Sequence, residues 1–332
     1  MVSTHTSEIE GNMSLFATRE DVKVDGTNVR SGPPHAAGPD SGVRIRQMDD
    51  ADLRRILKLR SVVRWAADPR AFSLLRGVRD ARWAVAESPG GVLVGMVGAV
   101  PLGDIGVLCH LAVQEGYRGL GLGAGLSSWA IAYLKSRGAK TARLYSTRQA
   151  EGLYRSLGFV ASAARTVYAL EEASSRPRPP SRAGGHEVGT LTFSDLPELY
   201  GVDRWSYGAD RSHLIFATLR LHPGNGLVAR DSSGRIKGYL VRSAGGDAIH
   251  LGPFVAATPD VARLLLALAL GETGRRPVRV VVPGLEEHPA HALLLEFGFE
   301  GRKDRLRMEL GEVTDDQPAG LVHYGTTPYM AT

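Results

Sequence analysis

Hydrophobic and polar residues follow two periodicities along the chain, that of a strand and that of a helix, and the order in which these occur predicts a mixed α/β fold. The run 43–48 alternates as a strand does, and apolar residues at helical spacing follow Asp50. Two apolar runs flank the turn Ser-Pro-Gly-Gly within 83–100, which predicts a β-hairpin. Further strands are predicted at 105–113, 143–147 and 159–170, a helix ending at Gly138 and a short helix at 151–157.

The pattern then repeats in the second half of the chain. The hairpin 83–97 recurs at 227–241, and the motif LYRSLGF at 153–159 recurs as LLLEFGF at 293–299. Ordered matches at nearly constant spacing indicate a duplicated fold. The predicted organisation is a disordered tail (1–42), a first repeat (43–170), a Pro/Arg/Ser-rich linker (171–185) and a second repeat (186–332).

Composition excludes several classes of protein. The 332 residues include 40 Lys and Arg and 35 Asp and Glu, a net charge of only +5. Because this charge is not concentrated in a basic stripe, we expect no nucleic-acid partner. A single cysteine, Cys109, excludes an internal disulfide framework and a cysteine-based metal site, and we expect no metal. The longest apolar stretch, at 264–270, is far shorter than the roughly 20 residues of a membrane span. Without a secretory signal pattern, a cytoplasmic location is expected.

The stretch 111–134 combines a strand end, a glycine-rich loop and an amphipathic helix. Glycines allow close backbone approach, and the first N–H groups of a helix attract anions, so the arrangement predicts a phosphate site. The loop lacks the lysine of a P-loop, and the acid that a dinucleotide-binding fold places about 20 residues later is missing.

The motif R-x-x-G-x-G at 118–123, preceded by L-A-V and followed by L-Y-x-x-L-G-F, resembles the GNAT superfamily of acetyl-CoA-dependent N-acetyltransferases over 43–170. The resemblance implies that the loop binds the pyrophosphate of acetyl-CoA and that the strand end at 111–113 pairs with its pantetheine. A backbone N–H near Val113 would polarise the thioester carbonyl. The cofactor-binding residues so implied are Leu111, Ala112, Val113, Arg118, Gly119, Leu120, Gly121, Leu122, Gly123, Ala124, Thr147 and Tyr154.

The resemblance also implies that Tyr154 protonates the departing thiolate; its alternative role is that of a core aromatic. Many family members carry a glutamate base on the strand before the loop, and this strand has none. Asp104 and His110 are the nearby candidates, His110 with a suitable intrinsic pKa. The alternative for His110 is an ordinary strand position. Covalent transfer through Cys109 is disfavoured, because the family transfers the acetyl group directly.

In the second repeat the loop is replaced by Thr258-Pro259-Asp260, a good helix start and a poor phosphate site, because proline lacks a donor and the carboxylate repels anions. We therefore expect no CoA there. The chain is similar to two-lobed bacterial acetyltransferases, whose second lobe shapes the acceptor pocket. Asp203, Tyr207, Asp210 and Arg211 are then candidates for substrate binding, the alternative being a structural role. The tail 323–332 would add an edge strand.

The expected fold is two tandem GNAT folds of the α/β (α+β) class, each a mixed, mostly antiparallel sheet flanked by helices. The expected function is acetyl transfer from acetyl-CoA to a primary amine of a small molecule by direct attack in a ternary complex. A protein or peptide amine is one alternative, and an acyl-CoA-binding module without catalysis, suggested by the missing glutamate, is another. We leave a homodimer open.

Overall fold

The computed structural model describes residues 42–63, 69–171, 181–245, 247–284, 288–312 and 321–326. The predicted disordered tail and most of the predicted linker lie outside these ranges. Within them, strands and helices alternate as the hydrophobic pattern predicts, and the mixed α/β class with a mostly antiparallel sheet is confirmed.

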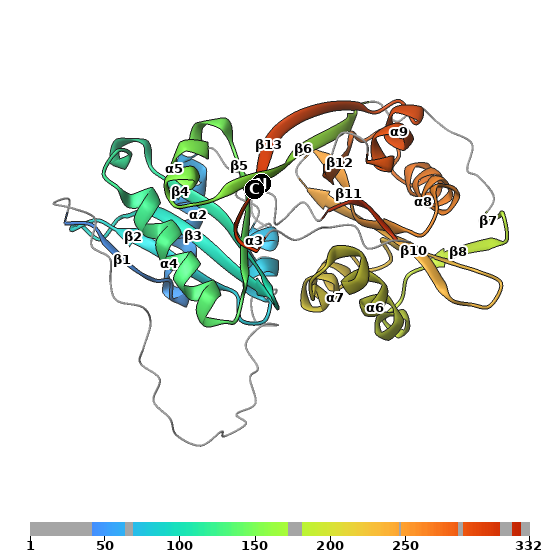
Figure 1. Ribbon diagram of the computed structural model, residues 1–332, viewed down its shortest axis with the longest axis horizontal. Helices are drawn as coiled ribbons and strands as arrows, with labels where there is room; N and C mark the ends of the chain where they lie inside the picture. The colour runs from blue at the N-terminus through green and yellow to red at the C-terminus, as the bar shows by residue number, and fades with distance from the viewer. Residues whose placement is uncertain are drawn as a thin grey trace, which may run out of the picture. The chain divides into compact units, whose positions relative to one another are not determined.

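The first repeat builds an antiparallel meander that continues into one parallel pairing (Figure 1). Its strands are β1 (Arg44–Gln47), β2 (Arg82–Glu87), β3 (Leu93–Leu102), β4 (Ile105–Val113) and β5 (Thr141–Ser146). One face of this sheet packs on α2 (Leu53–Val62) and α3 (Pro69–Arg76), and the other on α4 (Leu122–Ser136) and α5 (Glu151–Ser156). Short 3-10 turns lie at Asp50–Asp52, Glu115–Tyr117 and Arg148–Ala150.

The second repeat has the same order of elements, which supports the inferred duplication. Its strands are β7 (Arg182–Ala183), β8 (His186–Thr190), β9 (Gly226–Arg230), β10 (Ile236–Gly245), β11 (Ala248–Ala256) and β12 (Val278–Pro283). A 3-10 turn (Phe193–Asp195), α6 (Leu196–Tyr207) and α7 (Ser212–Leu221) lie on one face, and α8 (Pro259–Gly271) and α9 (Pro289–Glu296) on the other.

The last strands of the two repeats are exchanged. β6 (Val160–Leu170) follows the first repeat but pairs with β12, whereas β13 (Glu300–Gly311) follows the second repeat but pairs with β5. The two strands also pair with each other, so the described strands form one continuous sheet (Figure 1). We expected a separate sheet for each repeat. Because β6 and β13 are equivalent strands, each repeat's edge can accept either one.

In the first repeat, β4 and β5 separate soon after they meet. They pair in parallel only from Ile105↔Thr141 to Val107↔Arg143. Beyond this point, residues 108–113 of β4 have no strand on the β5 side in the described part of the chain. A wedge-shaped gap therefore opens toward the carboxyl end of β4.

The equivalent gap of the second repeat is filled by the chain itself. β11 and β12 pair only from Ile249↔Val278 to Leu251↔Val280, and β14 (Val322–Gly325) then pairs antiparallel with residues 254–256 of β11. On the other side, the Thr326 N–H donates to the Val281 carbonyl at 2.8 Å. The C-terminal segment was expected at a sheet edge. It lies instead in an interior gap, where both neighbouring strands offer unpaired backbone groups.

Candidate active site

A β-bulge shapes the end of β4 that borders the gap. Met96 faces Ala112 and Gly98 faces Cys109, so His110 and Leu111 together oppose the single residue between them on β3. His110 adopts a φ of 53°, in the left-handed region that non-glycine residues rarely occupy. Bulges bend a strand and interrupt its ladder. The segment Leu111 to Val113 follows the bulge and borders the gap, where an extended ligand with amide groups can pair with it.

The glycine loop begins helix α4 beside this strand end. Gly119 and Gly121 have φ values of 78° and 74°, which glycine adopts without strain, and Gly121 is the N-cap residue. The first intrahelical bond runs from the Gly125 N–H to the Gly121 carbonyl, 3.0 Å, so the amides of the three preceding residues start the helix without intrahelical partners. Arg118 donates from Nε to the Val113 carbonyl at 3.2 Å and joins loop and strand. A helix start of this kind offers backbone donors to an anion.

Tyr154 lies on α5, close to the start of α4. On the same helix, the Leu153 side chain would lie only 3.2 Å from a Cβ at Gly123. Tyr154 is 5% exposed and meets Phe159 edge-on, with ring centroids 5.7 Å apart. Burial raises the pKa of Tyr154 far above 10, so its hydroxyl remains protonated at neutral pH. Thr147 lies at the exposed end of β5, as the N-cap of the turn that leads into α5.

His110 is held by an arginine from α2. Its Nδ1 lies 2.9 Å from Arg60 Nη1, and both side chains are buried. A guanidinium can only donate, so Nδ1 accepts and the neutral ring carries its proton on Nε2. In this arrangement His110 is a hydrogen-bond donor through Nε2 and has no nitrogen left to accept a proton. The geometry therefore does not favour His110 as the general base.

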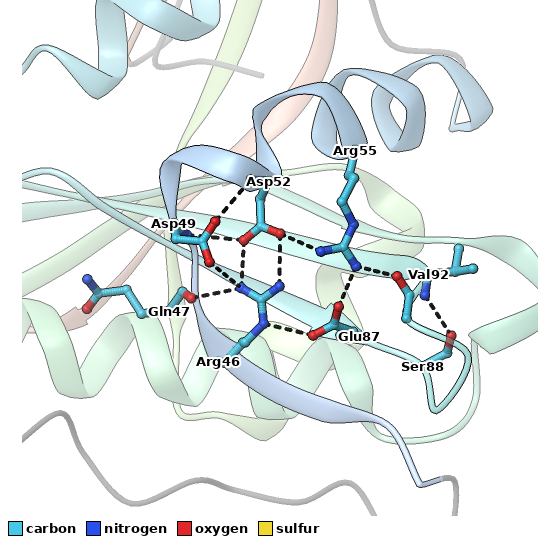
Figure 2. Close-up of polar contacts among 9 residues, drawn as sticks. Arg46, Gln47, Asp49, Asp52, Arg55, Glu87, Ser88 and Val92 are labelled. Carbon is cyan, nitrogen blue, oxygen red and sulfur yellow. Dashed lines mark hydrogen bonds and ion pairs between the residues drawn. The ribbon is translucent and has the colours of Figure 1, made fainter. Parts of the chain in front are cut away.

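An ionic network at the other end of α2 fixes this helix to the sheet (Figure 2). Arg46 on β1 forms a fork with Asp52, at 2.6 and 2.8 Å, and donates from Nε to Glu87 at 2.8 Å. Arg55 on α2 donates to Asp52 at 2.7 Å and also binds Glu87. The hydrogen bonds from Arg46 and then Arg55 lower the pKa of Glu87 to about 2. The network ties α2 to β1 and β2, and Arg60 lies on that same helix.

Asp104 and Cys109 do not supply the missing base. Asp104 lies in the exposed turn before β4, at the end of the strand remote from the gap, where it pairs with Lys140 at 2.9 Å. Cys109 is buried, and burial raises the pKa of its thiol to about 12. A thiol held in its protonated form is a poor nucleophile. The geometry thus disfavours a covalent acetyl-cysteine route.

Charged side chains outside the predicted site residues lie on the sheet face opposite α4. Glu309 on β13 accepts from Arg143 on β5 at 2.7 Å, and Arg307 faces Tyr145 across the same two strands. Arg165 on β6 lies over the Tyr145 ring, 5.5 Å from its centroid. The strand exchange brings these residues together, and no local motif marks them. The charged positions that alternate along β13, unusual for an interior strand, were the one available signal.

Three of the four candidate residues of the second repeat come together. Arg211 forms a buried fork with Asp203, Nε–Oδ2 3.0 Å and Nη2–Oδ1 2.5 Å, and the Tyr239 hydroxyl donates to the same carboxylate. The Tyr207 ring lies 3.9 Å from the Arg211 guanidinium and 5.9 Å from that of Arg143. Tyr207 is therefore the member of this group that reaches the first repeat.

Asp210 lies apart from that group. Its carboxylate accepts from the Ser212 N–H at 2.9 Å at the start of α7, and its own N–H donates to the Leu102 carbonyl of the first repeat at 3.2 Å. These two bonds make Asp210 part of the contact between α7 and β3.

Comparison with known proteins agrees with this geometry. The sequence profile of the acetyltransferase (GNAT) family matches residues 51–159, and that of a second acetyltransferase (GNAT) domain matches residues 200–321. The chain belongs to the GNAT acetyltransferase family and contains two GNAT domains in tandem. It is therefore an acyltransferase, of a family that generally uses acetyl-CoA as donor.

One relative and two solved structures are similar to this chain over most of its length. The chain is 25% identical over 223 residues to the uncharacterized N-acetyltransferase YitH of Bacillus subtilis (strain 168), covering 67% of this chain and 76% of the relative. The fold resembles a GCN5-related N-acetyltransferase from Sphaerobacter thermophilus, with TM-score 0.62, 18% identity, and 88% and 100% of the two chains covered. It also resembles a tandem GNAT protein from the clavulanic acid biosynthesis pathway, with TM-score 0.60, 16% identity, and 82% and 100% covered.

Neither a metal centre nor a membrane-spanning helix occurs among the described residues. No group of three or more His, Cys, Asp or Glu side chains in those ranges is placed to hold a metal ion. No helix in the described part of the chain is long and apolar enough to cross a membrane.

Proposed function

We propose that the protein acetylates a primary amine of a small molecule, with acetyl-CoA bound in the gap between β4 and β5. One observation carries this proposal, namely the difference between two equivalent gaps. The first gap lies beside the glycine loop, and in the described ranges no strand pairs with residues 108–113 of β4 on its β5 side. The second gap holds β14. In addition, Pro259 and Asp260 replace the glycines of the second repeat. The first repeat binds the cofactor, and the second supports it.

In this proposal acetyl-CoA is held by backbone groups. The amides at the start of α4 hold the pyrophosphate, because they have no intrahelical partner and lie at the positive end of a helix. The Arg118 N–H, which was expected among these donors, already donates to the Glu115 carbonyl at 3.1 Å. The strand end at 111–113 pairs with the pantetheine amides as a neighbouring strand would. Thr147, at the opposite border of the gap, contacts the same arm. The N–H near Val113 stabilises negative charge on the thioester oxygen.

The transfer itself is a direct attack. The amine nitrogen forms a bond to the thioester carbon, the C–S bond breaks, and its electron pair goes to the CoA sulfur. Tyr154 supplies a proton to this sulfur, a role that its protonated and buried hydroxyl suits. Because Arg60 fixes His110 as a donor, we propose that the amine reacts from its neutral form and that its proton leaves to solvent.

A small acceptor is favoured by the way the second repeat covers the sheet. Tyr207, Ala209 and Leu214 pack into the same core cluster as residues of α2, α3 and β4. The segment between α6 and α7 therefore lies over the sheet face from which the amine approaches. A protein substrate needs an accessible groove at this place, and the cover argues against one.

Steady-state kinetics with a panel of amines tests the proposal. Initial rates of CoA release, with acetylated product identified by mass, are measured for amino acids, polyamines, amino sugars and a lysine-containing peptide. Product from a small amine supports the proposal, and product from the peptide alone supports the protein-amine alternative. Acetyl-CoA binding without any product supports the second candidate, a binding module without catalysis, which the hydrogen-bonded state of His110 favours.

A further inference from the structure

The two exchanged strands occupy equivalent places in the centre of the sheet (Figure 1). β6 begins at Val160 and β13 at Glu300, and the pairing between them is symmetric, because Val160 faces Glu309 and Glu300 faces Ala169. Counted from the first residue, Glu309 and Ala169 therefore occupy the same position in their strands. By backbone pairing alone, the order β5-β6-β13-β12 would be as acceptable as the observed order β5-β13-β6-β12.

The observed order is the less local of the two. β6 follows β5 in the same repeat with only α5 between them, whereas β13 comes at the end of the second repeat. Arg143 on β5 and Glu309 on β13, which face each other, are 166 residues apart in the sequence. Because closing a longer loop costs more conformational entropy, chain connectivity favours β6 beside β5. The exchange must therefore be specified by side chains.

The strands that receive β13 and β6 each carry an arginine at the matching position. Arg143 faces Glu309 on β13, and Arg279 on β12 faces Ala169 on β6. In the alternative order the partners would be interchanged. Ala169 would then face Arg143, and Glu309 would face Arg279. The two orders thus differ in which arginine meets the carboxylate.

The two arginines differ in burial. The Arg143 side chain is 1% exposed, and its Nε lies 2.7 Å from Oε1 of Glu309, whose side chain is fully buried. The Arg279 side chain is 22% exposed, and it contacts the largely exposed Glu171, just beyond the end of β6, at 2.8 Å. Loss of a carboxylate partner is strongly destabilising for a buried guanidinium, whereas water can replace the partner of an exposed one. The carboxylate of β13 therefore lies opposite the arginine that depends on it more.

We propose that the buried ion pair between Arg143 and Glu309 selects the exchanged arrangement, in which β13 rather than its equivalent β6 completes the sheet of the first repeat. The pair acts by making the alternative order unfavourable, because Ala169 offers no acceptor to the Arg143 guanidinium. The second repeat is thereby joined to the first through a strand that only β13 can supply. This selection belongs to the fold and does not depend on the proposed function.

Disulfide cross-linking can report which strand lies beside β5. Leu310 and Leu170 follow Glu309 and Ala169 in the two strands, and Leu310 faces Ala142 on β5. Directly paired residues have Cα separations that a disulfide can bridge. In a Cys109→Ala background, Ala142→Cys is combined with either Leu310→Cys or Leu170→Cys, and disulfides within the monomer are quantified by mass spectrometry. We expect at least 10-fold more cross-linking with Leu310→Cys, and equal cross-linking with both would overturn the proposal.

Moving the carboxylate to the other strand is the decisive variant. Glu309→Ala together with Ala169→Glu places the acid on β6, and the ratio of the two cross-links should fall at least 10-fold. Glu296→Ala is the matched control, because Glu296 also accepts from an arginine, Arg263, but in an exposed ion pair. This control should leave the ratio unchanged. A smaller fall in the variant with the moved carboxylate overturns the proposal.

A second variant keeps the test decisive if the first does not fold. Arg143→Met with Glu309→Met replaces the ion pair by apolar side chains, which buried positions often accept without loss of stability. The ratio of the two cross-links should again fall at least 10-fold, because neither strand then offers a preferred partner to β5. A folded double-methionine variant with a smaller fall also overturns the proposal. The cross-links require neither acetyl-CoA nor turnover, so a failure of the proposed function leaves this result readable.

Discussion

Substitution of Gly121 by aspartate separates the folding of the loop from its binding role. Gly121 has a φ of 74° and caps α4, so a Cβ brings about 1–2 kcal/mol of strain. A carboxylate at a helix N-terminus returns about 0.3–1 kcal/mol. The expected loss in the free energy of unfolding is therefore small, roughly 1 kcal/mol.

The expected loss in cofactor binding is much larger. An aspartate carboxylate about 5 Å from a phosphate with one negative charge, at an effective dielectric constant of about 20, raises the free energy of binding by about 3 kcal/mol. Because about 1.4 kcal/mol corresponds to a factor of ten, the Kd for acetyl-CoA should rise more than 100-fold. The added side chain also occupies the space that a phosphate needs.

Isothermal titration of the wild type and variants with acetyl-CoA measures this effect, and denaturant unfolding measures stability. Gly91→Asp is the matched control: it has the same φ of 74°, open space around the added Cβ, and a position in the exposed β2–β3 turn. Gly91→Asp should lose similar stability and keep its Kd. A folded Gly121→Asp variant with a Kd within threefold of the wild type would refute the assignment of the loop.

Four further results are expected. Tyr154→Phe should lower kcat by about 10²- to 10⁴-fold with an unchanged Kd for acetyl-CoA, and a parallel loss of both would mark Tyr154 as a packing residue. The pH profile of kcat/KM should rise toward the pKa of the amine without an ascending limb near 6.5; such a limb, removed in His110→Gln, would show that His110 is the base. Substitution of Tyr324, a 1% exposed residue of β14, by alanine should lower the free energy of unfolding by about 3–5 kcal/mol. This variant should still bind one molecule of acetyl-CoA per chain, and binding of a second molecule would contradict the filled gap. Glu87→Gln should destabilise the protein at pH 7 but little near pH 2, as measured by denaturant unfolding at each pH. The lowered pKa of Glu87 contributes stability that is present above pH 4.5 and is lost as the pH falls toward 2. An equal loss at both pH values would exclude this ionic contribution.

The two repeats differ in the gap between their parallel strands. One repeat keeps the glycine cradle and the gap beside it, and the other has filled its gap with β14 and lost the glycines. The filled repeat still contributes to the first, because β13 completes its sheet and brings Arg307 and Glu309 to its face. Neither sheet is complete without the other repeat, because β6 and β13 are exchanged between them.

The sequence by itself determined the elements and the cofactor loop. Strand β4 and the helix after the loop lie where the periodicity predicts, because alternation and helical spacing are local properties of the chain. The glycine loop is also local, since Gly119, Gly121 and the first amides of α4 are neighbours in sequence. The tandem fold was predictable for a related reason: a repeated pattern is visible without any contact.

The tertiary structure alone decided what lies beside these elements. β6 and β13 have equivalent patterns, so the sequence does not show which sheet each strand completes. The state of His110 depends on Arg60, 50 residues earlier, and the ion pair of Arg143 joins residues 166 apart. Pairing over such distances is determined by the packing of the whole chain. The glycine loop could therefore be predicted from the sequence, whereas the partners of His110 and Arg143 could not.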